Sequence, residues 1–500
     1  MKECLSEHQQ CQHIDPPNLP TRVVDVGVST ESNIKLIEPP RGTKAEYLTL
    51  SYCWGRPRFL VTLNENIEQH RQGIEIERLP QTFRDAIKIT RELGFRYIWI
   101  DALCIIQDSS EDKANEIGQM GSIYNESTLT IGVVAAETVA EGFLKTKPVR
   151  YIDTPYKCAG GEMGSVRISV QKEVDLWNEW LFTRAWCLQE NFLSQRLLLY
   201  TDSEVIWQCE TVKIKRNHTT HVSYVRENPT LGSSPFNRVS INMLKSPINN
   251  ESDSRALQSL DGERYNVWRS IVGNYTRRNL TVASDRLPAL AGVAQKLQEV
   301  WHDKYILGIW GRQLLPSIAW QRDPQLQDIK QPYYARLSEY RAPSWSWASI
   351  DGPVQFDTRF DLGNARGMGA KVSISTEEGS DESDSLVVEG HIISVQDMLG
   401  RSSSHQGHLC LDDHSEESKW PFFADDFERN LSEEDRQSAF CLLLGEGKSG
   451  SGKMMKTVAL VMLRTKDTDQ FQRIGLWEST VKGASKIWVG GTNRKTIRLV

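Results

Sequence analysis

Residues 96–108 constrain the fold more than any other stretch of this 500-residue chain. They read RYIWIDALCIIQD, an apolar run that leads straight into a polar cluster. Just before them, residues 80–93 place apolar side chains at helical spacing, with Pro80 at the start and Gly94 directly after the end. A helix that feeds a buried strand across a two-residue turn is typical of crossover units in a parallel sheet.

Neighbouring segments extend this pattern in both directions. Residues 47–55 (YLTLSYCWG) predict a strand, residues 111–124 a helix and residues 128–136 a fully buried strand. The order is strand, helix, strand, helix, strand. It predicts an α/β fold, doubly wound around a mainly parallel sheet.

Ligands in such a sheet gather outside the carboxyl ends of the strands, so polar residues at those ends are the candidates for a site. The first strand ends at Ser51, Tyr52 and Trp54. The second strand is followed by Asp101, Cys104, Gln107 and Asp108.

Residues 183–193 (TRAWCLQENFL) predict a helix that carries polar side chains beside its apolar positions. These are Arg184, Gln189 and Glu190, with Trp186 among them. Two interpretations stay open at this point, one structural and one functional.

In the structural interpretation, Arg184 pairs with Asp101 or Asp108 and holds the helix on the sheet. In the functional interpretation, Glu190 acts as an acid or base in an apolar cleft lined by tryptophan. Loss of water around the carboxyl group would then raise its pKa.

Cys104 offers a different chemistry, that of a thiol nucleophile. Such a nucleophile needs a base, normally a histidine. His70 is the only histidine between residues 47 and 210, and it lies in a polar segment. Packing of a small buried thiol is the alternative interpretation of Cys104.

Charge and composition exclude several classes of partner. The 59 basic and 65 acidic residues are well mixed and give a net charge of -6, which is no footprint for nucleic acid. Nine scattered cysteines fit reduced intracellular thiols. No apolar run approaches the roughly 20 residues that span a bilayer. We therefore expect a cytoplasmic protein with no membrane span and no nucleic-acid partner.

Metal-ligating residue types gather near the amino terminus, at Cys4, His8, Cys11 and His13. Zinc accepts these ligands, but gaps of three, two and one residues are cramped beside finger and ribbon spacings. The sequence therefore leaves two alternatives, a zinc site and a metal-free, partly ordered lead-in. The expectation is that no metal is bound.

Residues 447–453 (GKSGSGK) approach the pattern of a phosphate-binding loop. Met454 stands where serine or threonine would ligate magnesium, and the flanking segments both read as strands. A hairpin loop is the better interpretation, and no bound nucleotide cofactor is expected.

Further along, the tryptophans Trp345 and Trp347 alternate as on one face of a strand, where core packing is their expected role. The whole chain divides into five predicted regions. They are an N-terminal lead-in with short strands (1–45), the α/β domain (46–210), a linker or surface loop (211–260), a helical region (261–340) and a β-rich C-terminal region (341–500).

Together, the segments 47–55, 79–86, 97–108 and 184–190 resemble the fungal heterokaryon-incompatibility (HET) domain. The resemblance implies a cytosolic protein of self/non-self recognition whose domain triggers programmed cell death when unlike cells fuse. It also implies protein partners in a death pathway, and self-association.

The HET family is thought to be related to Toll/interleukin-receptor (TIR) domains, many of which cleave NAD at the nicotinamide glycosidic bond. Their signature of Trp-Cys, two residues and a catalytic glutamate is matched by Trp186, Cys187 and Glu190. The resemblance thus implies a TIR-like fold, Glu190 as catalytic residue, Trp54 or Trp186 stacked on nicotinamide, and NAD as substrate. The alternative is a non-catalytic module that self-associates and recruits a death pathway.

Overall fold

The computed structural model divides the chain into two compact units. Unit 1 comprises residues 1–244 and 288–293, and unit 2 comprises residues 245–287 and 294–500. The residues that the structure describes are 1–11, 15–27, 33–56, 58–145, 151–157, 160–169, 176, 179–216, 222–224, 254–323, 340–356, 369–374, 385–402, 423–424, 438–448, 455–465, 469–479 and 494–500.

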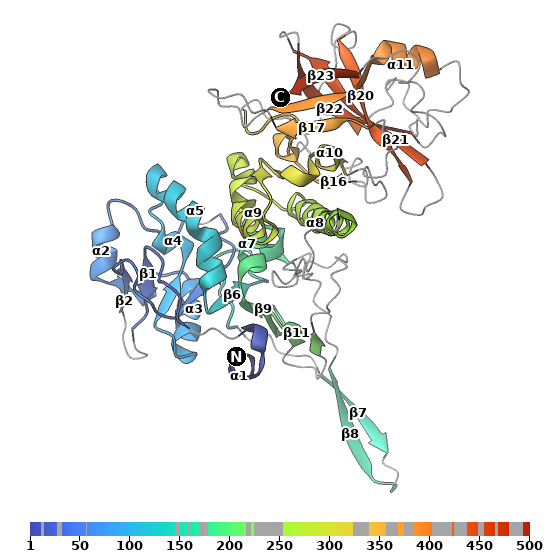
Figure 1. Ribbon diagram of the computed structural model, residues 1–500. Helices are drawn as coiled ribbons and strands as arrows, with labels where there is room; N and C mark the ends of the chain where they lie inside the picture. The colour runs from blue at the N-terminus through green and yellow to red at the C-terminus, as the bar shows by residue number, and fades with distance from the viewer. Residues whose placement is uncertain are drawn as a thin grey trace. The chain divides into compact units, whose positions relative to one another are not determined.

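Unit 1 is built around one large sheet with helices packed on it (Figure 1). Its strands are β1 (Val23–Asp25), β2 (Asn33–Ile37), β3 (Tyr47–Ser51), β4 (Ile74–Glu75), β5 (Tyr97–Trp99), β6 (Leu129–Val133), β9 (Arg196–Tyr200), β10 (Val205–Cys209), β11 (Val212–Arg216) and β12 (Val222–Tyr224). Its helices are α1 (Lys2–Glu7), α2 (Ile67–Gln72), α3 (Gln81–Glu92), α4 (Asp101–Cys104), α5 (Ser110–Glu126), α6 (Trp180–Thr183) and α7 (Trp186–Leu193). The strand order is β12-β11-β10-β9-β6-β3-β5-β1-β2-β4.

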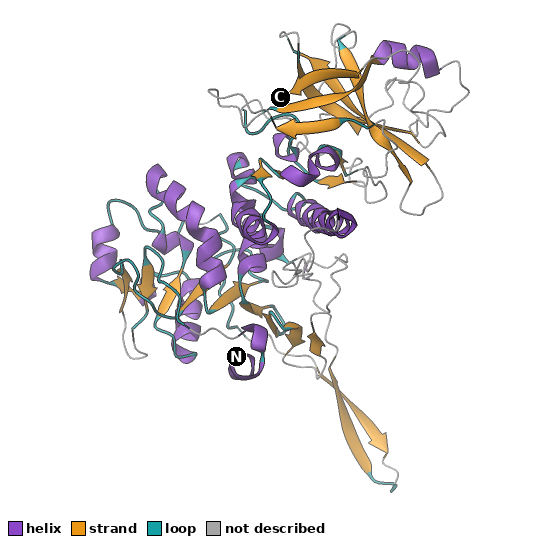
Figure 2. Ribbon diagram, viewed as in Figure 1, coloured by secondary structure: helices purple, strands orange, loops and turns teal. Residues whose placement is uncertain are grey.

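Four central strands, β5, β3, β6 and β9, run parallel. Numbered along the chain, their spatial order is 2-1-3-4, and the order reverses between β3 and β6. In open α/β sheets this switch point is where ligands bind. The chain moves along the sheet in one direction through the crossover helix α3 and in the other direction through α5. Right-handed connections therefore place these helices on opposite faces of the sheet, as Figure 1 and Figure 2 show.

The strands outside this centre pair antiparallel. β1 joins β5 on one side, and β10 joins β9 on the other through a hairpin around residues 202–203. The α/β fold is therefore as predicted, but the sheet is mixed and only its central four strands are parallel. Within residues 211–260, predicted as a linker or surface loop, the described residues form β11, β12 and the beginning of helix α8 (Ser254–Tyr275).

A separate two-stranded hairpin lies in the chain between β6 and α6. Its strands are β7 (Tyr151–Lys157) and β8 (Met163–Ser169). Several large apolar side chains on it are exposed, including Ile152, Tyr156 and Met163. Because these side chains are exposed, they form no buried face, and no pattern of buried positions in the sequence predicts the hairpin.

Unit 2 begins with helices and ends in a strand-rich region. Its first elements are α8, the part of α9 (Pro288–Trp301) from residue 294 on, β13 (Tyr305–Ile306), β14 (Ile309–Trp310), α10 (Leu314–Ser317), β15 (Trp320–Arg322) and β16 (Val354–Phe356). The remaining elements are β17 (Lys371–Ile374), β18 (Leu386–Ser394), α11 (Val395–Ser402), β19 (Phe423–Ala424), β20 (Ala439–Lys448), β21 (Met455–Arg464), β22 (Gln470–Ser479) and β23 (Arg494–Leu499).

The last strands of unit 2 form a small barrel. β18, β20, β21 and β22 pair in that order, and β23 closes the ring by pairing with both β18 and β22. The core of the barrel includes Leu443, Ala459 and Val461. Strands β20 and β21, on either side of the phosphate-loop-like sequence, form the predicted hairpin.

Trp345 and Trp347 are both fully buried, in agreement with a packing role. The predicted strand is wrong, however, because residues 347–349 form a 3-10 helix. The indole of Trp347 donates a hydrogen bond to the carbonyl of Gly308 at 2.8 Å. The alternation of the two tryptophans therefore indicated two buried positions but not a strand.

Candidate functional site

The end of strand β3 lies at the switch point of the sheet. All five residues of β3 are buried, with β5 on one side and β6 on the other. Ser51 is the last residue of the strand and pairs in register with Gly132 of β6. The next residues, Tyr52 to Trp54, therefore leave the sheet at the edge where the carboxyl ends of the parallel strands meet.

Asp101, the first residue of α4, joins this edge from β5. Its Oδ1 accepts hydrogen bonds from the Tyr52 hydroxyl and from the backbone N–H of Ala102, both at 2.7 Å. Its Oδ2 accepts one from the Trp54 indole at 2.9 Å. Asp101 thus ties the residues after β3 to the residues after β5.

Two aromatic contacts complete this arrangement. The ring of Tyr52 meets that of Phe83 edge to face at 5.2 Å, and Trp54 meets Phe59 at 5.4 Å. Burial, together with the Asp101 charge, raises the pKa of Tyr52 well above its ordinary value. Tyr52 is therefore a protonated hydrogen-bond donor at neutral pH.

Glu190 reaches the same edge from helix α7. Its side chain is buried, at 3% exposure, and its Oε2 accepts a hydrogen bond from the Ser51 hydroxyl. A carboxyl group removed from water requires such a partner, because burial of an uncompensated charge is costly. Ser51 and Glu190 are 139 residues apart in sequence and are brought together by the fold.

Arg184, just before α7, supplies positive charge beside the two carboxyl groups. Its guanidinium donates to the backbone carbonyl of Tyr52. Burial alone would lower the pKa of Arg184, but the surrounding negative groups, Glu190 first among them, raise it overall. Arg184 therefore stays charged.

The edge thus combines a buried carboxylate, a serine hydroxyl, a protonated tyrosine and a cation. Residues 47–190, which include all of these groups, match the family model described as heterokaryon incompatibility protein (HET). This part of the chain is a HET domain. No curated protein and no solved structure matches the chain. The match connects the chain with heterokaryon incompatibility in general.

Cys104 and Gln107 lie in the turn after Asp101, and their packing and hydrogen bonds stabilise the interior of the HET domain. Cys104 is fully buried, and burial raises the pKa of its thiol to about 12, so it is a neutral thiol at physiological pH. The Gln107 amide donates to the carbonyls of Asp101 and Ile105, at 3.1 and 3.2 Å. These contacts hold the turn that carries Asp101.

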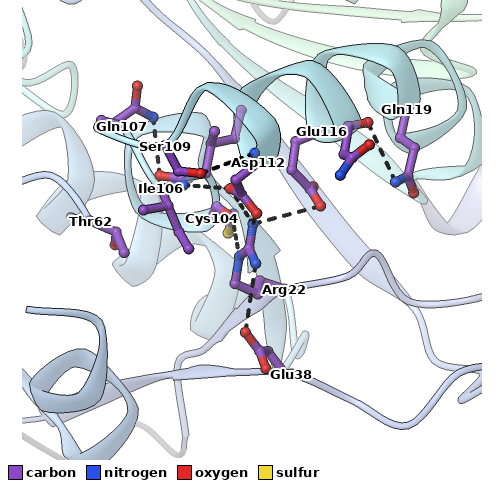
Figure 3. A network of polar contacts seen from close by, with 12 residues as sticks. Arg22, Glu38, Thr62, Cys104, Ile106, Gln107, Ser109, Asp112, Glu116 and Gln119 are labelled. Carbon is purple, nitrogen blue, oxygen red and sulfur yellow. Dashed lines mark hydrogen bonds and ion pairs between the residues drawn. The ribbon is translucent and has the colours of Figure 1, made fainter. Parts of the chain in front are cut away.

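Sequence reasoning missed Arg22, which anchors the same turn from the segment before β1. Its Nε donates to the carbonyl of Cys104, and its other end pairs with Asp112 of α5, both at 2.6 Å (Figure 3). Glu116, one helical turn further, lies 3.7 Å from the guanidinium. The signal in the sequence was the i, i+4 acidic pair on a helix face, which calls for a cation.

His70 lies on α2, and its ring is hydrogen-bonded to the Thr62 hydroxyl at 2.9 Å. That hydroxyl also donates to the carbonyl of Leu103. Burial lowers the pKa of His70. Asp108, the other acidic residue of this region, is exposed and accepts from the backbone and side-chain amides of Asn64 at 2.9 and 3.0 Å.

Gln189 and Trp186 occupy other parts of α7. Gln189 is buried, and its Oε1 accepts a hydrogen bond from the backbone N–H of Gly292 at 2.7 Å, within unit 1. Consecutive helical residues point about 100° apart, so Gln189 leaves the helix in a different direction from Glu190. Trp186 is half-buried at the start of the helix.

The structure gathers three of the four predicted metal-ligating residues at the amino terminus. Cys4, His8 and Cys11 lie together with Cys209, whereas His13 lies outside the described residues. Among the described helices, none is long and apolar enough to cross a membrane.

Proposed function

We propose that the HET domain is an effector of programmed cell death in self/non-self recognition and that it acts by hydrolysing NAD. The observation that carries the proposal is Glu190, a buried carboxylate held at the switch point of a 2-1-3-4 sheet. Sites for nucleotide cofactors form at such points. The strand order and the Trp186 to Glu190 sequence both support a distant relationship with TIR domains.

In this reaction, the bond between ribose C1′ and the nicotinamide ring nitrogen breaks, and its electron pair neutralises the pyridinium. The ribose then carries positive charge, as in other glycosidic cleavages. The Glu190 carboxylate stabilises that charge. Water adds to C1′ and releases a proton, so the products are nicotinamide and ADP-ribose.

The neighbouring groups have complementary roles in the proposal. Arg184 offers a cation for a phosphate of the substrate. Trp54 and Trp186, both half-buried, offer ring faces on which nicotinamide stacks. Ser51 holds the Glu190 carboxylate in place until a substrate hydroxyl takes over its hydrogen bond.

The test is NAD consumption by the purified chain, measured at increasing protein concentration and after artificial clustering. We expect wild type to release nicotinamide and Glu190→Gln, which keeps the shape but loses the charge, to be slower by at least about 10²-fold. Glu111→Gln, on the exposed first turn of α5, is the matched control and should keep full activity. Circular dichroism of each variant establishes that it is folded.

If clustered wild-type protein leaves NAD intact, the enzymatic proposal fails. Ser51→Ala provides a second check, because it retains the carboxylate and removes only its hydroxyl partner. An intermediate loss of rate is expected for it. Equal rates for Glu190→Gln and wild type would also overturn the role of Glu190.

A second function, that of a non-catalytic module that self-associates and recruits a death pathway, is favoured by a different observation. Ser51 binds Glu190, and Asp101 binds Tyr52 and Trp54, so these polar groups already serve to hold the domain together. Regulated expression in fungal cells separates the two functions. Death without loss of cellular NAD in Glu190→Gln cells supports the module, and survival of those cells supports the enzyme.

A further inference from the structure

A cluster of soft metal ligands lies at the amino terminus, away from the residues that the proposed function uses. Its four members are Cys4, His8, Cys11 and Cys209. We call it the Cys3His cluster. One ligand atom from each residue lies within 4.8 Å of the other three.

Local structure explains how three of the ligands come together. Cys4 is on helix α1, and His8 follows four residues later, so both lie on one side of that turn. Cys11 ends the 3-10 helix Gln9–Cys11, which turns the chain back toward them. The gaps that look cramped in an extended sequence are thus accommodated by two short helices.

The fourth ligand comes from the far end of the domain. Cys209 is the last residue of β10, and its Sγ lies 3.4 Å from His8 Nδ1. The backbone N–H of Val212 donates to the same sulfur at 3.2 Å. A hydrogen bond from a backbone amide stabilises a thiolate, and such outer contacts orient metal ligands.

Charge and burial around the cluster also suit a thiolate-bound cation. The three cysteines are at most 2% exposed and pack with Val212 and Trp207. Arg196, itself 1% exposed, donates to the carbonyl of Cys11. Three thiolates around a divalent cation carry one net negative charge, which the Arg196 guanidinium offsets.

We propose that the Cys3His cluster binds one Zn2+. Zinc takes sulfur and nitrogen ligands at about 2.3 and 2.1 Å in a tetrahedron, in which sulfur atoms lie about 3.8 Å apart. Contraction of the cluster by about 1 Å therefore completes the coordination. All four positions are filled by the protein, so the site is structural: it fastens the amino terminus to β10, a strand of the sheet, where Figure 1 shows α1 next to β9 and β11.

The first experiment measures zinc in the full-length chain, purified with a reductant that does not chelate metals. About one zinc per chain is expected. Cobalt exchanged for zinc should give the thiolate-to-cobalt charge-transfer band and the intense visible bands of a tetrahedral site. Folded wild-type protein that lacks zinc and takes up neither added zinc nor cobalt overturns the proposal.

Variants then assign the ligands. Cys209→Ser should lose bound zinc and weaken the cobalt charge-transfer band, whereas Cys441→Ser, a buried cysteine of β20, should keep both. A Cys209→Ser protein with full zinc content overturns the assignment.

A measurement on wild type covers the case in which the variant fails to fold. Native protein is treated with an alkylating reagent before and after a chelator, and the modified cysteines are identified by mass spectrometry. We expect Cys4, Cys11 and Cys209 to react only after chelation. A disulfide between any two of them, or the same reactivity with and without chelator, contradicts the zinc site.

Discussion

At the residue scale, Asp101 is the side chain on which both aromatic residues after β3 depend. It accepts hydrogen bonds from the Tyr52 hydroxyl and from the Trp54 indole, each of which has a single hydrogen to donate. A neutral amide has one acceptor oxygen, so Asp101→Asn turns an N–H toward one of these donors. We expect the free energy of unfolding to fall by about 1–3 kcal/mol.

Chemical denaturation measures this change. Asp15→Asn is the control, because Asp15 is exposed and lies 4.0 Å from Lys44, and the change there should be below about 0.5 kcal/mol. An Asp101→Asn protein as stable as wild type would show that the carboxylate does not hold the two rings.

Some residues at the edge of the sheet where the parallel strands end were predictable from the sequence, and others were not. Ser51, Tyr52 and Asp101 were predictable because each ends or follows a buried parallel strand, and strand ends converge. The surroundings of Cys104 and Gln189 were not predictable, since the direction of a side chain depends on packing. Cys104 is fully buried in the α4 turn, and Gln189 binds the backbone of Gly292.

At the scale of elements, hydrogen bonds to one carboxylate fasten helix α3 to the loop that follows β6. The Asp85 carboxylate of α3 accepts from the backbone N–H groups of Phe143 and Leu144, at 2.7 and 3.1 Å. Gly142 precedes them with φ of 73°, and a Cβ there would lie 2.6 Å from Asp85 Oδ2. The close approach leaves no room for a side chain at residue 142.

Gly142→Ala therefore combines an unfavourable φ with a steric clash, and Gly94→Ala separates the two effects. Gly94 follows α3 with φ of 82°, and a Cβ there meets no atom within 4 Å. We expect Gly94→Ala to cost about 1–2 kcal/mol and Gly142→Ala about 1–3 kcal/mol more, by chemical denaturation. Equal losses would mean that the loop moves aside without cost.

The helices and strands of the domain centre were predictable because their apolar residues recur with clear periods. Helix α3 and strands β3 and β6 lie where those periods place them. Short strands were expected within residues 1–45, but the antiparallel pairing of β1 with β5 and of β2 with β4 was not predictable, since strands this short contain too few residues to show a period. Their pairing partners are set by the fold.

At the scale of the whole molecule, each of the two units has its own core, and the barrel of unit 2 depends on β23. Ile497 of β23 is buried and pairs in register with Val388. Ile497→Asp removes an apolar side chain and places a carboxyl group in the barrel. We expect it to destabilise unit 2 by at least about 3 kcal/mol.

Hydrogen exchange measured by mass spectrometry locates the effect. Peptides from β18, β20 and β21 should lose protection, while peptides from β3 and β6 of unit 1 keep theirs. Lys495→Asp places the same carboxylate at an exposed position of β23 and is the control. Equal loss of protection in both units would contradict separate cores.

The division into units could not be read from the sequence, because the boundary cuts helix α9 and leaves its first residues, 288–293, in unit 1. Gly121 of α5 meets Gly292 there so closely that a Cβ on Gly121 would lie 2.7 Å from the Gly292 Cα. Two isolated glycines 171 positions apart carry no signal of this contact in one sequence.

Closure of the barrel by its last strand has a consequence for biosynthesis. The ring opens with β18, which ends at Ser394, and cannot close before Leu499 has left the ribosome. At about 5–20 residues per second, translation of the intervening chain takes roughly 5–20 s. During that time β18 has an edge without its final neighbour, and unpaired edges attract other strands. Until β23 is complete, the nascent barrel is thus open to pairing with the wrong strand.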